Sequence, residues 1–296
     1  MEKKTVDVII PAYRPGEGWK QMLRGLEGQT WPVHRLIVMN TGKENWKEAY
    51  EKTTIPMEVH HLTREEFDHG KTRDQAARMS RADYLLFMTQ DALPEDCHLI
   101  EKLVDLFLLS VFWLVCSLPV FTLGPATAAL YRTVVRCIRG SERKSWSLFF
   151  RTFRENFKVG ALTTLVVVAV GAVLFVLYTL LYQTASLNRA GYILFMAYYV
   201  FLLLPLGLLC YLFPVLSQFE FGVGGLLSNC AKLAIAHLPS TIALALLLYA
   251  ALTVCLNFFL AIAVTPALLA LLHSLLLERI FAPYIRQQLG EDDNDT

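Results

Sequence analysis

Residues 98–115, which read HLIEKLVDLFLLSVFWLV, separate two kinds of sequence and decide the fold class. Before this stretch the chain is charged, and short apolar runs alternate with polar segments. After it, the apolar runs are long enough for helices that cross a membrane, which need about 20 residues each. We therefore predict an α/β unit over residues 1–98, a parallel sheet of Rossmann-like type, and an all-α multi-pass membrane unit over residues 99–286. The acidic tail, 287–296, is expected to be disordered.

The composition agrees with two units in different solvents. The chain has 296 residues and is 55% hydrophobic, and most of its lysines and acidic residues precede Asp105. A net charge of +1 gives no reason to expect a nucleic-acid partner. No signal-peptide pattern opens the sequence, so we expect the N-terminal unit in the cytosol. The six cysteines form no C-x-x-C pair and are expected to be structural.

The first unit alternates strands with helices, which predicts a parallel sheet. We expect strands at 6–10, 35–39, 57–62 and 84–88, and helices at 17–28, 44–52 and 71–79. In parallel α/β sheets, ligands bind at the carboxyl ends of the strands. Polar clusters follow the predicted strands at these ends, so a binding site is expected there.

Two of these clusters have both a chemical and a structural interpretation. Asp91 follows an apolar strand, and its carboxylate could hold Mg²⁺ or Mn²⁺ on a diphosphate. The alternative is a turn-capping Asp before Pro94. Residues 68–73 open a helix whose N–H groups, with Lys71 and Arg73, could bind an anion. The alternative is a helix capped in the ordinary way, with an exposed basic face.

Taken together, the motifs of this unit resemble the family 2 glycosyltransferases of the GT-A fold, and among them the bacterial rhamnosyltransferases. The motifs are residues 8–16 (VIIPAYRPG), 29–32 (QTWP), 37–41 (IVMNT), 67–73 (FDHGKTR) and 88–92 (MTQDA). The resemblance covers residues 6 to about 103 and implies a nucleotide-sugar ligand, such as a dTDP- or UDP-sugar.

The same resemblance implies roles for individual residues. Residues that would bind the nucleotide-sugar are Pro11, Ala12, Tyr13, Asn40, Asp68 and Arg73. The first three would line the nucleotide pocket, Asn40 would lie near the base, and Asp68 and Arg73 would approach the ribose and diphosphate. Asp91 would carry the metal, Mg²⁺ or Mn²⁺. The family's acceptor-binding half, which supplies the catalytic base, is replaced here by membrane sequence, so we expect no catalysis by this chain alone.

The second unit contains six apolar segments, at 106–123, 126–138, 161–182, 191–215, 240–256 and 258–277. The basic residues between 132 and 158 favour the cytosolic side, which predicts six embedded segments with both termini inside; five full spans is the alternative. Residues 145–158 are amphipathic, with aromatic residues on one face. We expect this helix to lie in the membrane interface, or alternatively to pack on other cytosolic segments.

Residues 117–131 (SLPVFTLGPATAALY), 149–158 (FFRTFRENFK) and 236–239 (AHLP) resemble the YesL-like membrane proteins, a domain of unknown function. The resemblance runs from about Ile100 to Arg286. It implies a carbohydrate context in bacteria, with sugar-transport components as partners, and no assigned chemistry.

Three functional hypotheses follow. The first is a membrane protein in carbohydrate uptake or the cell envelope that carries an incomplete glycosyltransferase unit. The second is a membrane-anchored glycosyltransferase acting on an envelope glycan or lipid acceptor. The third is a nucleotide-sugar-binding accessory or sensor of a sugar transporter. No Gly/Ser/Pro linker separates the two units. A direct junction without a linker is the result expected from recombination or mis-assembly of two genes.

Overall fold

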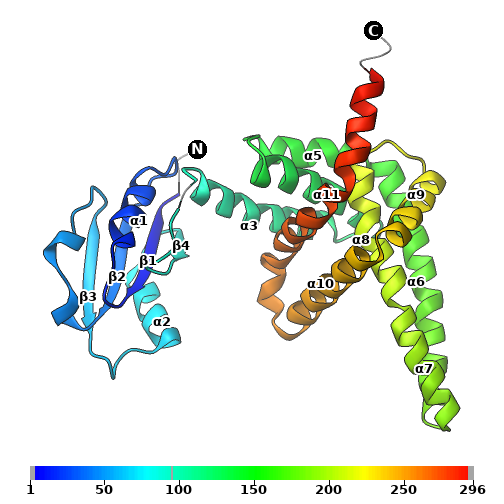
Figure 1. Ribbon diagram of the computed structural model, residues 1–296, viewed down its shortest axis with the longest axis horizontal. Helices are drawn as coiled ribbons and strands as arrows, with labels where there is room; N and C mark the ends of the chain where they lie inside the picture. Colours follow the sequence, from blue (N-terminus) through cyan, green and yellow to red (C-terminus); the bar gives the residue numbers. More distant parts are fainter. Residues whose placement is uncertain (1–3, 95, 293–296) are drawn as a thin grey trace. The chain divides into compact units, whose positions relative to one another are not determined.

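The computed structural model describes residues 4–94 and 96–292. The chain divides into two compact units, Met1–Val104 and Asp105–Thr296, and helix α3 (Leu99–Cys116) contains the boundary between them. As expected, a small parallel sheet comes first and a helical unit follows (Figure 1). The last helix continues to Asp292, so helical structure extends into the expected tail, whose residues 293–296 lie outside the described part.

The first unit is built on four parallel strands in the order β3-β2-β1-β4. They are β1 (Val6–Ala12), β2 (Arg35–Thr41), β3 (Met57–Leu62) and β4 (Tyr84–Phe87). β1 and β2 are rich in Val, Ile and Leu and are almost entirely buried, as strands covered on both faces are. All four strands confirm the sequence prediction.

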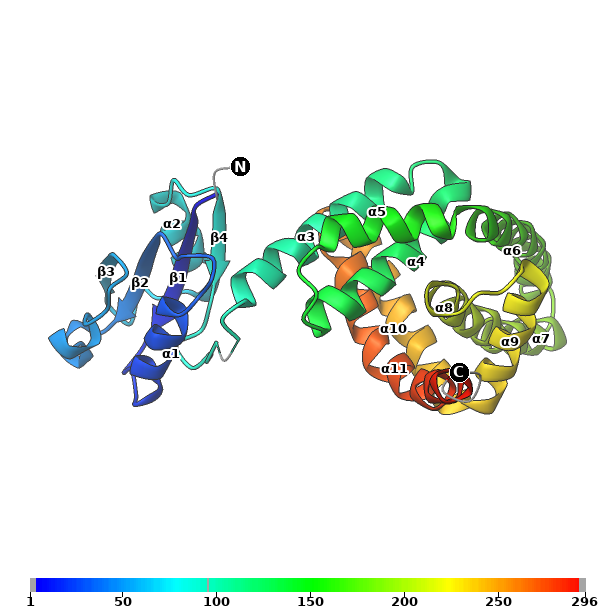
Figure 2. The same cartoon turned by 90° about the horizontal axis from the view of Figure 1, so that it is seen from above.

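Two helices cover opposite faces of this sheet (Figure 2). α1 (Gly18–Glu27) buries Trp19, Met22, Leu23 and Leu26 against the face that carries Val8 and Ile10. α2 (His69–Met79) places Ala76 on the other face, against Ile9, Ile37 and Met39. The odd and even residues of β1 therefore pack under different helices, as the period of two along a strand requires.

The prediction of a helix at residues 44–52 is wrong. The segment forms two short 3₁₀ turns, Lys43–Asn45 and Glu48–Tyr50. Gly42 adopts a φ of +83° before the first turn, and Lys47 is extended between the two, so no continuous helix can form. Edge-on aromatic packing holds the segment instead, with the ring centroids of Trp46 and Trp19 5.5 Å apart.

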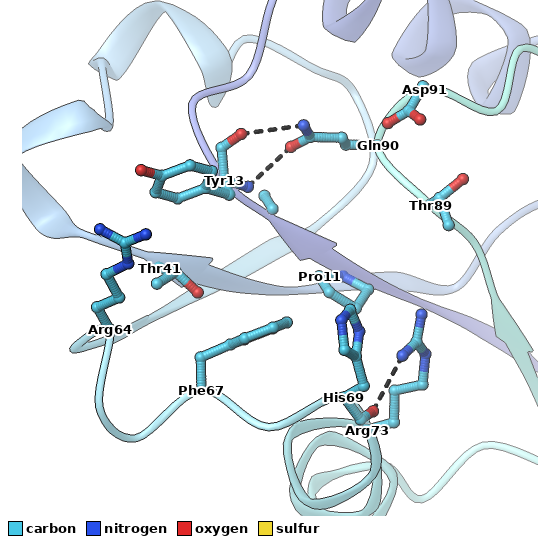
Figure 3. Close-up of a pocket in the computed structure, with 11 residues that line it drawn as sticks. Pro11, Tyr13, Thr41, Arg64, Phe67, His69, Arg73, Thr89, Gln90 and Asp91 are labelled. Carbon is cyan, nitrogen blue, oxygen red and sulfur yellow. Dashed lines mark hydrogen bonds between the residues drawn. The ribbon is translucent and has the colours of Figure 1, made fainter.

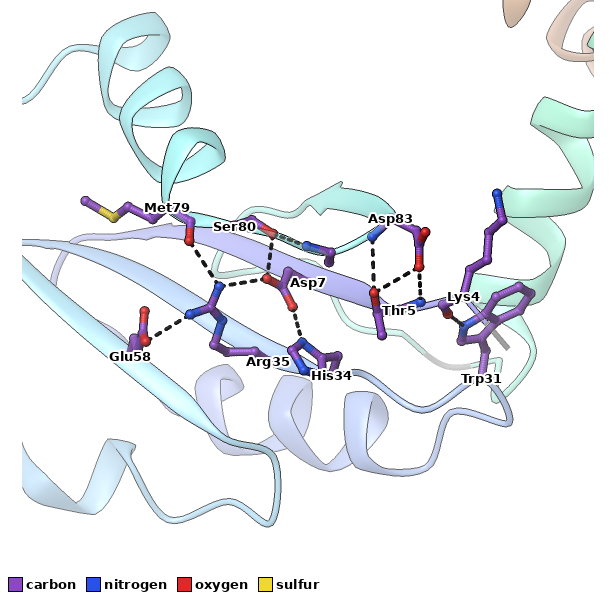
Figure 4. Close-up of polar contacts among 11 residues, drawn as sticks. Lys4, Thr5, Asp7, Trp31, His34, Arg35, Glu58, Met79, Ser80 and Asp83 are labelled. Carbon is purple, nitrogen blue, oxygen red and sulfur yellow. Dashed lines mark hydrogen bonds and ion pairs between the residues drawn. The ribbon is translucent and has the colours of Figure 1, made fainter. Parts of the chain in front are cut away.

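The amino end of β1 contains a buried ionic cluster (Figure 4). The Asp7 carboxylate is fully buried, and it lies 2.6 Å from Ser80 Oγ, 2.7 Å from His34 Nδ1 and 3.0 Å from Arg35 Nη2. Arg35 also donates to Glu58 on β3. Burial raises the pKa of Asp7, but the hydrogen bonds from these three partners outweigh it and hold the pKa below its ordinary value of 3.8.

Strand β4 forms one edge of the sheet and is only partly covered. Leu85 and Phe87 are 38% and 44% exposed. They pair with Asp7 and Ile9 in the parallel register, on the face where α2 covers the two central strands. An apolar edge of this kind leaves backbone groups and side chains accessible.

The second unit is entirely helical. After α3 come α4 (Leu123–Thr133, continuing as a π-helical turn to Arg139), α5 (Ser145–Glu155), α6 (Phe157–Ala185), α7 (Arg189–Phe201), α8 (Leu203–Gln218), α9 (Val223–Ala236), α10 (Leu238–Asn257) and α11 (Thr265–Asp292). Four helical stretches in the described part of the chain are long and apolar enough to cross a membrane: Phe157–Ala185, Arg189–Gln218, Leu238–Asn257 and Thr265–Gln287.

These four stretches match four of the six expected segments, while the other two, at 106–123 and 126–138, contain no helix of this kind among the described residues. α3 contains Glu101, Lys102 and Asp105, and Pro119 follows its end. α4 has only 11 residues. The apolar run at 106–138 is therefore divided by a turn, and charged residues precede it. A count of apolar residues alone does not reveal either feature.

Glycines bring helices α4 and α6 into close contact. A Cβ atom built on Gly124 would lie 2.3 Å from Thr164 Oγ1 and 2.5 Å from the carbonyl oxygen of Gly160. The Gly124 N–H donates to Thr164 Oγ1 at 3.0 Å. Small residues allow such approaches in membrane helices. This packing gives a physical reason for the run of small residues in 124–129, most of which is buried.

Helix α5 packs on other segments of the helical unit, and a position in the membrane interface stays a prediction. Phe149 is fully buried and packs with α4 residues in one core cluster. Trp146 and Phe150 remain 47% and 42% exposed.

Two arginines of the basic stretch donate to main-chain carbonyls: Arg132 to Ser217, in the last turn of α8, and Arg139 to Ser274. The contact of Arg132 satisfies one of the last carbonyls of α8, as basic side chains often do at a helix end.

Candidate functional site

A cavity of about 430 Å³ lies at the carboxyl ends of β1, β2 and β4 and beside the start of α2 (Figure 3). It is lined by Pro11, Ala12, Tyr13, Thr41, Arg64, Phe67, His69, Arg73, Thr89, Gln90 and Asp91. Its volume falls within the range of small-molecule sites. Five of the seven residues that the sequence selected line it: Pro11, Ala12, Tyr13, Arg73 and Asp91.

The ends of β1 and β4 are joined by the side chain of Gln90. Its Oε1 accepts from the Tyr13 N–H at 2.8 Å, and its Nε2 donates to the Tyr13 carbonyl at 3.0 Å (Figure 3). The side-chain amide thus makes the two hydrogen bonds to the main chain of Tyr13 that the backbone of a neighbouring strand would otherwise make. It fixes Thr89 and Asp91, which flank it, at the rim of the cavity.

The chain turns sharply after Tyr13. Arg14 has a φ of +48°, the left-handed region that non-glycine residues rarely occupy. Its guanidinium carbon lies 5.2 Å from the centroid of the Tyr13 ring, a cation–π contact. Backbone strain of this kind is found more often at functional sites than elsewhere.

The start of α2 is capped by Asp68. One oxygen of this carboxylate accepts from the N–H groups of Gly70 and Lys71, at 2.9 and 2.8 Å. These backbone hydrogen bonds lower the pKa of Asp68. The two N–H groups expected to attract an anion are therefore already hydrogen bonded to Asp68. Of the two interpretations of residues 68–73, this geometry favours the helix that is capped in the ordinary way. Asp68 is not among the residues that line the cavity.

Arg73 is the basic residue of α2 that reaches the cavity. It is half-buried, and its Nη1 donates to the His69 carbonyl one turn earlier at 2.9 Å. This contact leaves the other donors of the guanidinium available for a ligand, and a planar guanidinium suits bidentate binding of phosphate. Figure 3 shows Arg73 and His69 side by side under Pro11.

Asn40 lies inside the sheet and does not line the cavity. Its Nδ2 donates to the Gly42 carbonyl at 3.0 Å and lies 3.1 Å from His61 Nδ1. Its Oδ1 has no hydrogen-bond partner among the described residues. The side chain therefore supports the loop after β2, and a direct contact with a base stays a prediction.

The cavity offers a limited set of metal ligands. No group of three or more His, Cys, Asp or Glu side chains within residues 4–94 and 96–292 is placed to hold a metal ion. Asp91 contributes one exposed carboxylate to the cavity. Mg²⁺ is commonly bound by one or two carboxylates together with substrate phosphates and water. The donor set fits a metal that arrives with a diphosphate, and does not fit one held by protein alone.

A second cavity of about 410 Å³ adjoins the first and shares Tyr13, Thr41 and Arg64 with it. It adds three charged side chains: Arg14, Lys43 and Glu44. Four basic residues therefore line the two cavities, against the carboxylates of Asp91 and Glu44. This balance favours an anionic ligand.

Sequence reasoning missed several lining residues. Arg64 was not selected, although it follows the carboxyl end of β3, the position that identified the other clusters. Phe67, His69, Thr89 and Gln90 were noted only as parts of motifs. The hydrogen-bonding role of Gln90 depends on the pairing of β1 with β4, which no local pattern shows.

Comparisons with known proteins divide along the chain. Residues 106–178 match the family described as "Protein of unknown function, DUF624". The uncharacterized protein YteU of Bacillus subtilis is 28% identical over 166 residues, which cover 56% of this chain and 71% of that protein. No solved structure matches.

Two curated glycosyltransferases also match. The O-antigen chain rhamnosyltransferase RfbN of Salmonella typhimurium is 31% identical over 103 residues, 34% of this chain and 33% of the relative. The O-antigen chain rhamnosyltransferase WbaN of Salmonella anatum is 28% identical over 106 residues, 34% of this chain and 32% of the relative. The chain thus spans about a third of the length of these two relatives, and carries beside that likeness a stretch similar to a family without an assigned function.

Proposed function

We propose that this chain is a membrane protein whose N-terminal unit binds a nucleotide-sugar, in a carbohydrate-uptake or cell-envelope context. The observation that carries the proposal is the cavity at the carboxyl ends of β1, β2 and β4, with Arg64, Arg73 and Asp91 around it. The similarity to rhamnosyltransferases over about a third of the chain supports the class of ligand.

Each group at the cavity has a role that its chemistry suits. Arg73, with Arg64, would hold the diphosphate, since guanidinium groups bind phosphate oxygens with two parallel hydrogen bonds. The exposed ring of Tyr13 offers a surface on which a base or sugar can stack. Asp91 would ligate Mg²⁺ or Mn²⁺, which neutralises diphosphate charge.

Binding without sugar transfer is the activity these residues support. Inverting transfer needs a base that removes the proton from the acceptor hydroxyl. Among the described residues that line the cavity, only Asp91 and His69 could accept a proton; Asp91 is the residue proposed for the metal, and His69 lies beside Arg73, the residue proposed for the diphosphate. The likeness to rhamnosyltransferases favours a second candidate, a membrane-anchored transferase, which would need an acceptor-binding part from another chain.

The test is nucleotide-sugar binding by the full chain in lipid nanodiscs, with dTDP-rhamnose and UDP-glucose as probes, each with and without Mn²⁺. Arg73→Ala is expected to weaken binding about 10- to 100-fold, since a hydrogen bond to a charged group contributes about 1.5–3 kcal/mol. Asp91→Asn is expected to remove the effect of Mn²⁺ and leave metal-free binding intact.

Arg78→Ala is the matched control. Arg78 lies on the same helix, is exposed, and pairs with Asp74 rather than with the cavity. Equal affinities for the Arg73 and Arg78 variants would rule out the cavity as the binding site. Release of free nucleoside diphosphate by the chain alone would instead support the transferase.

We also propose that the N-terminal unit faces the cytosol. The basic residues between 132 and 154 precede the first long apolar helix, α6, and basic loops favour the cytosolic side. In a cysteine-free background, Ser186→Cys, between α6 and α7, is expected to react with a membrane-impermeant maleimide on intact cells. Ser141→Cys, before α5, should react only after permeabilisation. The reverse pattern would place the N-terminal unit outside.

A further inference from the structure

The helical unit contains a cavity of about 360 Å³ that the proposed function does not use. α3, α4, α8, α10 and α11 all contribute to its wall, which is formed mainly by Leu, Ile, Phe, Pro and Ala side chains. Leu252, in the wall, is 50% exposed. Three of these helices belong to candidate membrane spans, so lipid can reach this rim. The volume suits a small apolar or amphiphilic molecule.

One polar group of this wall has an unused bonding position. His273 lines the cavity and is only 7% exposed. Its Nε2 is buried and has no partner in the part of the chain that the structure describes. In the neutral ring that carries its proton on Nδ1, Nε2 presents a lone pair, which is a hydrogen-bond acceptor.

The indole and hydroxyl groups of the wall already donate their protons within the protein. Trp113 Nε1 donates to Thr127 Oγ1, and the Thr127 hydroxyl donates to the Leu123 carbonyl. The Tyr131 hydroxyl donates to Glu278, and that of Thr265 to the Ala261 carbonyl. The hydroxyl and indole groups of the wall therefore have no proton left to give, and the complementary ligand is a donor.

A buried acceptor without a partner costs free energy, and a ligand that supplies a donor there removes this cost. We propose that the cavity binds the alkyl chain of a hydroxyl-bearing lipid or long-chain alcohol, whose O–H donates to Nε2 of His273. The apolar wall takes the chain, and the single acceptor selects a molecule with one hydroxyl over an alkane or an ether of the same length.

The test uses brominated probes, which quench the fluorescence of Trp113 on contact. The full chain in nanodiscs is titrated with 11-bromoundecanol and with 11-bromoundecyl methyl ether, which lacks the donor. The alcohol is expected to saturate at about tenfold lower mole fraction than the ether, the effect of one hydrogen bond. His273→Leu should bring both probes to the value of the ether. Trp113→Phe isolates the emission of this tryptophan.

A second variant keeps the test decisive if His273→Leu fails to fold. Ala270→Phe, on the same wall, should fill the cavity and abolish saturable quenching by both probes. Equal values for alcohol and ether in the native protein, or saturable quenching that survives Ala270→Phe, would overturn the proposal. A dibrominated diacylglycerol distinguishes the sources: quenching that depends on His273 assigns the site to a membrane lipid, and its absence assigns it to a single-chain alcohol.

Discussion

Replacing Gly124 with alanine is expected to destabilise the helical unit by about 3 kcal/mol, at the upper end of the cost of overpacking. The new Cβ would meet Thr164 Oγ1 at 2.3 Å and the Gly160 carbonyl oxygen at 2.5 Å. A hydroxyl can rotate away, but a backbone carbonyl can move only if the helix moves. Helices α4 and α6 must therefore separate, and the hydrogen bond from the Gly124 N–H to Thr164 is stretched or lost.

The chain offers a matched control in Gly171, which lies on α6 where an added Cβ would meet no heavy atom within 4 Å. Gly171→Ala is expected to be neutral or to stabilise the helix by about 0.5–1 kcal/mol, since alanine is the better helix former. Thermal unfolding of the full chain in mild detergent, followed by size-exclusion chromatography, measures both. Equal unfolding temperatures for the two variants would show that the α4–α6 contact is not tight.

Replacing Asp7 with alanine is expected to cost the first unit about 3 kcal/mol, because removing one partner of a buried ion pair leaves the other uncompensated. The Asp7 carboxylate accepts from Ser80 and Arg35 and contacts His34, and so ties β1 to residues before and within β2 and after α2. Arg35 would keep its contact with the more exposed Glu58, which limits the loss. Hydrogen exchange of β1 peptides in the full chain reports the change.

The surface pair Asp74–Arg78 supplies the control for this cluster. Both side chains are more than half exposed, so Asp74→Ala is expected to change stability by less than about 0.5 kcal/mol. If the Asp7 and Asp74 variants exchange β1 amides at the same rate, the buried cluster does not contribute to stability.

Acid provides a second readout of the same carboxylate. Its pKa is lowered in the folded state, so the unfolded chain binds a proton more readily. The stabilisation is fully present well above pH 3.8, the ordinary pKa, and is lost as the pH falls below this value toward the folded pKa. The protection factors of the β1 amides, in which the intrinsic pH dependence of exchange is divided out, should therefore fall in that window more steeply in the native protein than in Asp7→Asn.

The elements predicted correctly are those whose signal is local. β1 and β2 are continuous apolar runs, and α1 shows a stripe at helical spacing in Trp19, Met22, Leu23 and Leu26. Residues 44–52 show similar spacing, yet Gly42 and the packing of Trp46 on Trp19 decide their structure. Contacts between distant residues outweigh propensity there.

At the candidate site, too, some positions could be predicted from the local sequence and others could not. Residues that follow strands, such as Tyr13 directly after β1 and Asp91 four residues after the end of β4, reach the cavity because parallel strands end at one edge. Asn40 is the residue before the last in β2, but its side chain points into the protein, where His61 and Gly42 hold it. Since successive side chains of a strand alternate between faces, a shift of one residue separates a buried position from an exposed one.

The order of strands in the sheet has a consequence for synthesis of the protein. β1 lies between β2 and β4, and β4 is made last: Asp83, just before it, is hydrogen bonded to Thr5, 78 residues earlier in the chain. At roughly 5–20 residues per second, about 4–16 seconds separate the emergence of these two partners. During that interval a nascent β1 has one neighbour and one open apolar edge. The sheet can therefore close only after β4 has emerged, and the first candidate membrane span, Phe157–Ala185, begins about 70 residues later, so the first unit has about 4–14 seconds to fold before that span is made.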